Sequence, residues 1–263
     1  MNYKTALQCA ILSQEVYQDF QNENIFKSWP DATFIPINQD STDTQLALLT
    51  DPSDQFAVIV FRGSKGEKDW NTNIRFNRSE YQWSQAEKKE YKEQMEKVSE
   101  VVSDDKNLTY PNEYAETQSP VKMHDGFVQA YLSVREEIHN HINKLGAKQY
   151  RVTGHSLGGA LAKLCAIDLQ YNFSPDLSVE VYSFGAPRVG NKAFTESYNR
   201  RVPNTWRVVN GWDAVVGLPA PWQGYRHVET SIKLERRFTW QIITGSFEDH
   251  RIINYIEALR SRT

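Results

Sequence analysis

Cysteine is scarce in this chain of 263 residues, and the two that are present, Cys9 and Cys165, cannot build a disulfide framework. Cys165 lies in an apolar helical run, which predicts a buried thiol that packs as a small hydrophobic side chain. Metal-ligand spacings such as CxxC or HExxH are missing as well. The sequence therefore predicts neither a disulfide-stapled fold nor a metal site.

A large excess of one charge and long hydrophobic runs are also lacking. The formal net charge is −3, and no block of lysine and arginine is interleaved with aromatic residues, so we expect no nucleic-acid partner. No stretch approaches the ~18 apolar residues that a transmembrane segment needs. Residues 1–20 show helical spacing of apolar side chains rather than the pattern of a signal peptide. We expect a cytoplasmic protein by default, although a removed leader or secretion by another route would leave the same sequence.

What the chain does contain is an alternation of strand-like and helix-like segments. Its length suits one α/β domain, which we place over residues 1–263. The patterns predict strands at 45–49, 56–62, 149–153, 179–184 and 206–209, helices at 124–145, 157–170 and 249–260, and a late hairpin from 225–234 and 236–243. Such alternation predicts an α/β fold with a mostly parallel central sheet and helices on both faces.

The most informative motif is the run GHSLGGA at residues 154–160, in which Ser156 lies between Gly154 and Gly158. A serine used as a nucleophile must project from the end of the sheet, and a sharp turn from strand to helix achieves this with a strained backbone. The residues two before and two after it must be small, because strand and helix nearly touch there. A glycine-rich turn with a structural serine is the alternative, but the flanking strand and helix favour a nucleophile.

Further motifs follow one another in the order of a known family. They are VFRGS at 60–64 with DW at 69–70, HDGF at 124–127, GHSLGGALA at 154–162, SFGAPRVGN at 183–191, Asp213 before LP at 218–219, and His250. On these motifs the chain resembles the class 3 lipases, the fungal-lipase-like family of the α/β-hydrolases, over most of residues 45–255. The resemblance implies an α/β-hydrolase fold with a Ser–Asp–His triad, ester hydrolysis and a helical lid.

The candidate acid follows from the chain order of this fold, which is serine, then acid, then histidine. A serine hydroxyl needs a base to take its proton, and the base needs a carboxylate to orient it. Asp213 lies in the loop after the predicted strand at 206–209, where the acid belongs. Asp168 and Asp176 are interpreted instead as solvated charges on a helix and in a connecting loop.

Two late histidines compete for the role of base. His250 lies between the last predicted strand and the last predicted helix, and the resemblance also implies this late histidine. His227 lies inside a predicted strand and is interpreted as a packed or surface residue. His155 adjoins the nucleophile, but the turn should aim its side chain away from that of Ser156. His139 is interpreted as an ordinary residue of a helix surface.

The oxyanion of the tetrahedral intermediate needs hydrogen-bond donors. One donor in this fold is the backbone N–H of the residue after the nucleophile, which here is Leu157. The resemblance implies Ser64 as the second donor, through its backbone N–H and its hydroxyl. A plain turn serine after Gly63 is the alternative interpretation.

The predicted lid or cap is an insertion at about residues 65–120. The stretch 65–76 is polar, and its substrate-facing apolar contacts would be Trp70, Ile74 and Phe76. A polar lid partitions poorly into lipid, which favours soluble esters, short acyl chains or polar lipids. Residues 79–120 have no counterpart in the family, and their charge-rich helix either extends the cap or is a solvated insertion.

The sequence therefore predicts a carboxylic-ester hydrolase of the lipase type, which cleaves acylglycerols or related lipids through an acyl-enzyme on Ser156. A phospholipase or a soluble esterase for short-chain or aromatic esters would use the same chemistry. An inactive lipase-like interaction module is a third alternative, which the complete set of candidate residues argues against. The expected partners are a lipid or small ester substrate and, transiently, a lipid interface. We expect no cofactor.

Overall fold

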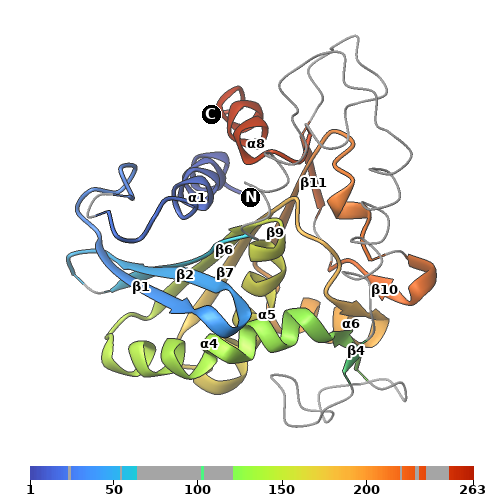
Figure 1. Ribbon diagram of the computed structural model, residues 1–263, viewed down its shortest axis with the longest axis horizontal. Helices are drawn as coiled ribbons and strands as arrows, with labels where there is room; N and C mark the ends of the chain where they lie inside the picture. Colours follow the sequence, from blue (N-terminus) through green and yellow to red (C-terminus); the bar gives the residue numbers. More distant parts are fainter. Residues whose placement is uncertain are drawn as a thin grey trace.

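A seven-stranded sheet forms the centre of the protein (Figure 1). The structure is a computed structural model that describes residues 1–22, 25–53, 55–63, 102–103, 121–219, 221–228, 231–234 and 249–263. In spatial order the strands of the central sheet are β1 (Thr33–Gln39), β2 (Thr44–Thr50), β3 (Phe56–Phe61), β6 (Gln149–His155), β7 (Ser178–Phe184), β9 (Thr205–Asn210) and β11 (Ser231–Leu234).

The central sheet is mostly parallel, as the sequence predicts. The first three strands form an antiparallel meander, whereas β3, β6, β7, β9 and β11 all run in the same direction. Parallel neighbours need a crossover, and α-helices lie in three of these connections: α4 between β3 and β6, α5 between β6 and β7, and α6 between β7 and β9. The carboxyl ends of the parallel strands therefore meet at one edge, where an α/β sheet usually binds its ligand.

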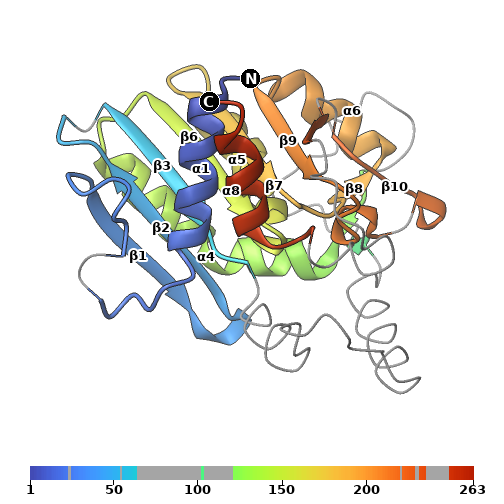
Figure 2. The ribbon, with the colours of Figure 1, turned by 90° about the horizontal axis from the view of Figure 1, so that it is seen from above.

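Helices cover both faces of the sheet (Figures 1 and 2). On one face α1 (Tyr3–Glu15) lies beside α8 (Ile252–Arg260), although the two come from opposite ends of the chain. On the other face lie α4 (Asp125–Lys144) and α5 (Leu157–Phe173), with α6 (Lys192–Arg201) next to α5. This arrangement is the α/β-hydrolase fold that the resemblance implies.

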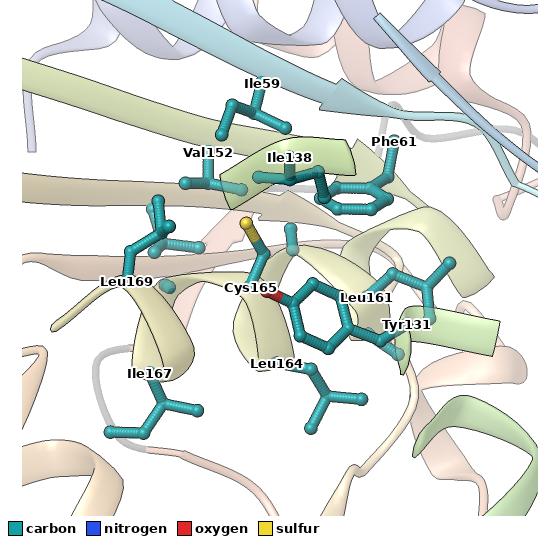
Figure 3. Packing of buried hydrophobic residues seen from close by; sticks show 14 of the residues in the cluster. Ile59, Phe61, Tyr131, Ile138, Val152, Leu161, Leu164, Cys165, Ile167 and Leu169 are labelled. Atoms are coloured by element: carbon teal, nitrogen blue, oxygen red, sulfur yellow. The ribbon is translucent and has the colours of Figure 1, made fainter. Parts of the chain in front are cut away.

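Strand alternation explains how one sheet supports two cores. In β3, Ile59 and Phe61 face the core under α4 and α5, while Val58 and Val60 face α1. Figure 3 shows the first core, in which Tyr131 of α4 and Cys165 of α5 pack against strand residues. Cys165 is fully buried and free, as its apolar surroundings predict, and burial raises the pKa of its thiol well above the ordinary value.

A second, small sheet consists of two-residue strands. Its order is β10 (Tyr225–Arg226), β8 (Gly190–Asn191), β5 (Met123–His124) and β4 (Val102–Ser103). The predicted strand at 225–234 is therefore wrong as one element: β10 pairs with β8 in the small sheet, and β11 pairs with β9 in the central sheet. The other half of the expected hairpin, 236–243, lies outside the described residues. Alternating side chains indicate a strand but do not choose its partner.

Three short 3₁₀ helices complete the described elements: η1 (Asp40–Thr42), η3 (Val215–Gly217) and η4 (Pro221–Gln223). In the part of the chain that the structure describes, no helix combines the length and the apolar character that a membrane crossing requires.

Candidate active site

Ser156 occupies the sharp turn between β6 and α5. Its backbone has φ 57° and ψ −127°. Residues other than glycine rarely adopt this conformation, which costs about 1–3 kcal/mol. A Cβ atom on Gly154 would lie 2.4 Å from the carbonyl carbon of Gly158, and one on Gly158 would lie 2.3 Å from the carbonyl oxygen of Phe61. Both positions must therefore be glycine for the turn to form.

A continuous chain of hydrogen bonds links Ser156 to His250 and Asp213. The Ser156 hydroxyl lies 2.9 Å from Nε2 of His250. The His250 Nδ1 lies 3.0 Å from Oδ1 and 2.9 Å from Oδ2 of Asp213. Because a carboxylate can only accept, Nδ1 carries the hydrogen and Nε2 is free to accept the serine proton. The structure thus brings together three residues that sequence reasoning selected from distant positions.

The fold explains why these residues meet. Asp213 follows the carboxyl end of β9, and His250 lies just before α8, which packs against β9. Gly185, at the end of β7, has φ +57°, and a Cβ on it would lie 2.6 Å from Oδ2 of Asp213 and 3.0 Å from Nδ1 of His250. A side chain at this position would separate the carboxylate from the imidazole.

Asp213 is buried, and further donors hold its carboxylate. The backbone N–H of Val215 donates to Oδ1 at 2.9 Å, and the Tyr255 hydroxyl donates to Oδ2 at 2.5 Å. Burial, with the neighbouring Asp213 charge, raises the pKa of Tyr255 well above the usual value, so this phenol stays protonated and acts as a donor. The sequence analysis did not select Tyr255. The only local signal for it is that it lies in the last helix, shortly after His250 in the sequence.

His155 contacts the candidate base rather than Ser156. Its ring packs against the His250 ring, with centroids 4.6 Å apart, and its Nε2 lies 2.7 Å from the His250 backbone oxygen. The Tyr17 hydroxyl lies 3.2 Å from its other nitrogen, Nδ1. These contacts position the backbone at His250, a role that sequence reasoning did not assign to His155.

Asp249 ties the loop of the candidate acid to that of the candidate base. Its Oδ2 accepts a hydrogen bond of 2.8 Å from the backbone N–H of Trp212, and its carbonyl accepts one of 3.1 Å from the Asn210 side chain. Because Trp212 precedes Asp213 and Asp249 precedes His250, the two bonds fix the distance between the loops.

Asp168 and His139 correct two of the sequence interpretations. Asp168 is fully buried rather than solvated, and it accepts from Tyr131 at 2.5 Å, Arg135 at 2.9 Å and Asn172 at 2.8 Å. The Nε2 of His139 lies 2.5 Å from the same carboxylate, so His139 is not a simple surface residue. Helical periodicity indicates which face a residue occupies, but not that a neighbouring helix covers that face with donors.

His227 does not join the triad. It follows β10, and its Nε2 donates to the carbonyl of Val216 at 2.8 Å. Burial and the nearby charges of Arg207, Lys163 and Arg188 lower its pKa to about 2, so this imidazole stays neutral. It holds the loop that follows Asp213.

The remaining candidates are described only in part. Leu157 is the first residue of α5, where backbone N–H groups have no acceptor within the helix and are available to a ligand. Ser64, Trp70, Ile74 and Phe76 lie outside the described residues. Among the described side chains, no cluster of three or more histidine, cysteine, aspartate or glutamate residues could hold a metal ion.

These features define an α/β-hydrolase with a serine-hydrolase triad. The serine lies on a strained turn at the carboxyl edge of a mostly parallel sheet, and it is hydrogen-bonded to a histidine that a buried aspartate orients. The family model "Lipase (class 3)" matches residues 58–222, which is more than half of the sequence. The chain belongs to the class 3 lipase family.

Individual relatives agree with this family. A "secreted mono- and diacylglycerol lipase" of Malassezia globosa is 33% identical over 111 residues, which are 40% of this chain and 36% of that protein. A chloroplastic "phospholipase A(1)" of Arabidopsis thaliana is 38% identical over 104 residues, which are 36% of this chain and 23% of that protein. The chain therefore spans less than half the length of these curated relatives. The expected cytoplasmic location is not supported, because the Malassezia relative is named as secreted.

The fold also matches solved structures. One is described as "a serine protease triad forms the catalytic centre of a triacylglycerol lipase". It has a TM-score of 0.69 and 23% sequence identity, and the match covers 94% of this chain and 92% of that one. At this identity the match establishes the shared fold.

Proposed function

We propose that the protein is a carboxylic-ester hydrolase of the lipase type that cleaves ester bonds of acylglycerols or related lipids. The observation that carries this proposal is the unbroken hydrogen-bond chain from the Ser156 hydroxyl through His250 to the buried Asp213. Ser156 lies on a strained strand-to-helix turn, which is where this fold has its nucleophile.

The proposed reaction has two halves. In the first, Nε2 of His250 takes the Ser156 proton while Oγ attacks the ester carbonyl, and the same nitrogen then protonates the departing alcohol. In the second, His250 activates a water that hydrolyses the acyl-enzyme and releases the acid. Asp213 keeps the imidazole in the required tautomer and stabilises its charged form, while Tyr255 and Val215 hold Asp213.

The negative oxygen of each tetrahedral intermediate would be bound by backbone N–H groups. We assign one to Leu157, whose position at the start of α5 adds the favourable end of the helix dipole. We assign the second to Ser64, which follows the carboxyl end of β3 in the sequence. No cofactor takes part in this scheme.

A phospholipase is the second candidate, because one relative of high local identity is named as a phospholipase A(1). It would use the same Ser156 chemistry at the glycerol ester bonds of a phospholipid. The choice between the two depends on which headgroup the site accepts.

We further propose that the chain forms one domain, 1–263, with a lid or cap at about 65–120 that bears Trp70, Ile74 and Phe76. Deleting residues 84–118 should then broaden the preference for acyl chain length. An identical preference in the deletion variant would reject the cap.

The proposed activity is tested with p-nitrophenyl esters from acetate to palmitate, with emulsified triglyceride and with phosphatidylcholine. We expect Ser156→Ala to lower kcat by at least about 10³-fold on every substrate that the wild type cleaves. Ser53→Ala, at an exposed loop serine, is the matched control and should keep full activity. Retained activity in Ser156→Ala, or a folded wild type inactive on the whole panel, would refute the proposal.

A further inference from the structure

Lys163 is a lysine in the protein interior that the proposed ester chemistry does not use. It lies on α5 with 1% of its surface exposed, and among the described residues its ammonium has one hydrogen-bond partner, the carbonyl oxygen of Pro187 at 3.3 Å. Burial, and then the charge of Arg207, lowers the pKa of Lys163 well below the ordinary value. Since an ammonium has three N–H donors, the charged form would leave two of them without an acceptor. A buried cation in this state is costly unless an anion neutralises it.

Arginines, rather than carboxylates, lie near Lys163. Arg207 is 8% exposed, and Arg188 directly follows Pro187, the residue that Lys163 contacts. Burial, and then the charge of Arg188, lowers the pKa of Arg207 to about 10. In the part of the chain that the structure describes, no carboxylate forms an ion pair with Lys163, Arg188 or Arg207. The described residues therefore gather positive charge in the interior without neutralising it.

Two buried polar atoms in this region also lack a hydrogen-bond partner among the described residues. One is the hydroxyl oxygen of Ser183, a fully buried residue of β7, and the other is Nδ1 of His227. The opposite ring nitrogen of His227, Nε2, donates to the carbonyl oxygen of Val216 at 2.8 Å, so Nδ1 of the neutral ring is an acceptor. The region thus lacks acceptors for Lys163 and Ser183, and it lacks a donor for His227.

The sheet register brings these groups to one face. Ser183 of β7 is the partner of Arg207 on β9, so their side chains project from the same face of the sheet. A Cβ atom on Gly159 would lie 3.2 Å from Cβ of Ser183, which places this face against α5, and Lys163 follows Gly159 by one helical turn. His227 joins the group, because burial and then the charges of Arg207 and Lys163 lower its pKa to about 2.

Hydrogen bonds to backbone carbonyls hold the arginines, and further positive charge leads to the surface. Nε of Arg207 donates to Val228 at 3.4 Å, and the Arg188 guanidinium donates to Pro219 at 2.7 Å. Arg226 is exposed, and its charge lowers the pKa of the partly exposed Arg188 after the larger effect of burial. An anion would therefore meet increasing positive potential on its way inward, and side chains that are already held in place.

We propose that the buried groups around Lys163 bind hydrogen phosphate, a tetrahedral oxyanion that keeps one hydrogen at neutral pH. Its negative oxygens would accept from the Lys163 ammonium, the Arg207 guanidinium and the Ser183 hydroxyl, and its O–H would donate to Nδ1 of His227. A buried water would serve Ser183 and His227 but would not neutralise the two cations. Phosphate binding involves no ester, so this site is independent of the chemistry at Ser156.

Sulfate is the matched competitor of hydrogen phosphate. It has the same tetrahedral shape but carries no hydrogen near neutral pH, so it would leave Nδ1 of His227 without a donor. A site with a buried acceptor disfavours a ligand that cannot donate to it. We therefore expect the affinity for phosphate to exceed that for sulfate by at least about tenfold.

Binding is measured by calorimetric titration with inorganic phosphate and with sulfate, with sodium chloride added to keep the ionic strength constant. We expect one saturable phosphate site in the parent. Lys163→Met keeps the length of the side chain but removes the ammonium, and Ser183→Ala removes only the hydroxyl, so each should weaken phosphate binding at least about tenfold. Lys144→Met removes the same charge from an exposed position on α4 and should bind phosphate as the parent does.

Thermal unfolding is the second measurement, and it also shows whether each variant is folded. The Tm of the parent should rise by about 3–5 °C for each tenfold increase in phosphate above its Kd. In Lys163→Met only the general effect of salts should remain, which sulfate at the same ionic strength measures. Without phosphate, Lys163→Met should unfold at the same temperature as the parent or higher, because it removes a buried cation that has no counter-ion.

Three results would overturn the proposal. One is a folded parent without saturable phosphate binding. Another is equal phosphate affinity in the parent, Lys163→Met and Ser183→Ala, because the anion would then bind elsewhere. The third is equal affinity of the parent for phosphate and sulfate, because the donor to His227 would then be unnecessary. None of these results bears on the proposed function, which Ser156→Ala tests on esters.

Discussion

At the scale of single residues, the candidate site depends on groups that never meet the substrate. The carboxylate of Asp213 accepts from His250, Val215 and Tyr255, which fixes its orientation from three directions. The two donors other than His250 also satisfy a buried charge that would otherwise be costly. The fixed carboxylate of Asp213 orients the imidazole of His250, and the imidazole in turn orients the hydroxyl of Ser156.

Tyr255→Phe is expected to lower kcat about tenfold with little change in KM, because it removes one donor to a charged carboxylate and keeps the ring that packs against Phe184. Tyr198→Phe is the matched control. Tyr198 is equally buried, but its hydroxyl is hydrogen-bonded to Thr205, the first residue of β9. Steady-state kinetics on a soluble ester measures both variants. Equal kcat values for the two would show that Tyr255 is structural only.

At the scale of elements, a buried polar network joins α4 to α5. Asp168 of α5 lies twelve residues after Ser156, about 18 Å along the helix, so the network is remote from the triad. Three of its four partners, Tyr131, Arg135 and His139, come from α4. The network therefore fixes how α4 packs on α5, the helix that begins directly after Ser156.

Asp168→Ala should lower the free energy of unfolding by about 3–5 kcal/mol, because it leaves buried donors and a cation without their acceptor. Denaturant unfolding measures this loss, and Asp176→Ala, at an exposed loop aspartate, should change stability by less than about 0.5 kcal/mol. A small effect at Asp168 would mean that water replaces the carboxylate, and that the network does not secure α4.

At the scale of the whole molecule, two buried histidines link stability to pH. Burial lowers the pKa of His124 to about 4 and, with nearby cations, that of His227 to about 2. In the unfolded chain both would titrate near the ordinary value of about 6.5. Below that pH the unfolded state takes up protons that the folded state does not, so stability is complete above about pH 6.5 and falls as the pH decreases.

Each of these histidines should remove up to about 1.4 kcal/mol of stability for each unit of pH below 6.5, until its own folded pKa is reached. Thermal unfolding between pH 7.5 and pH 4.5 measures the slope. His227→Gln keeps a donor for the Val216 carbonyl and should flatten the slope by about half of the combined histidine contribution. An unchanged slope in His227→Gln would show that folding does not lower the pKa of His227.

Much of this architecture could be predicted before the structure. Strand and helix positions follow from the spacing of apolar side chains, so the predicted helix at 124–145 differs from α4 by one residue at each end. The mostly parallel sheet and the class 3 lipase family are both confirmed. The prediction of a single strand at 225–234 was wrong because the two ends of this segment pair in different sheets.

What the sequence alone determined is therefore local. Gly154 and Gly158 permit a turn that other residues would block, and this steric rule marks Ser156 within a few positions of chain. What the tertiary structure decided is contact between distant segments: the approach of His250 to Ser156 across 94 residues, the donor from Tyr255, the burial of Asp168, and the exposure of Trp212 and Trp222. Backbone sterics and periodicity act over neighbouring residues, whereas burial and long-range hydrogen bonds depend on which surfaces the fold brings together.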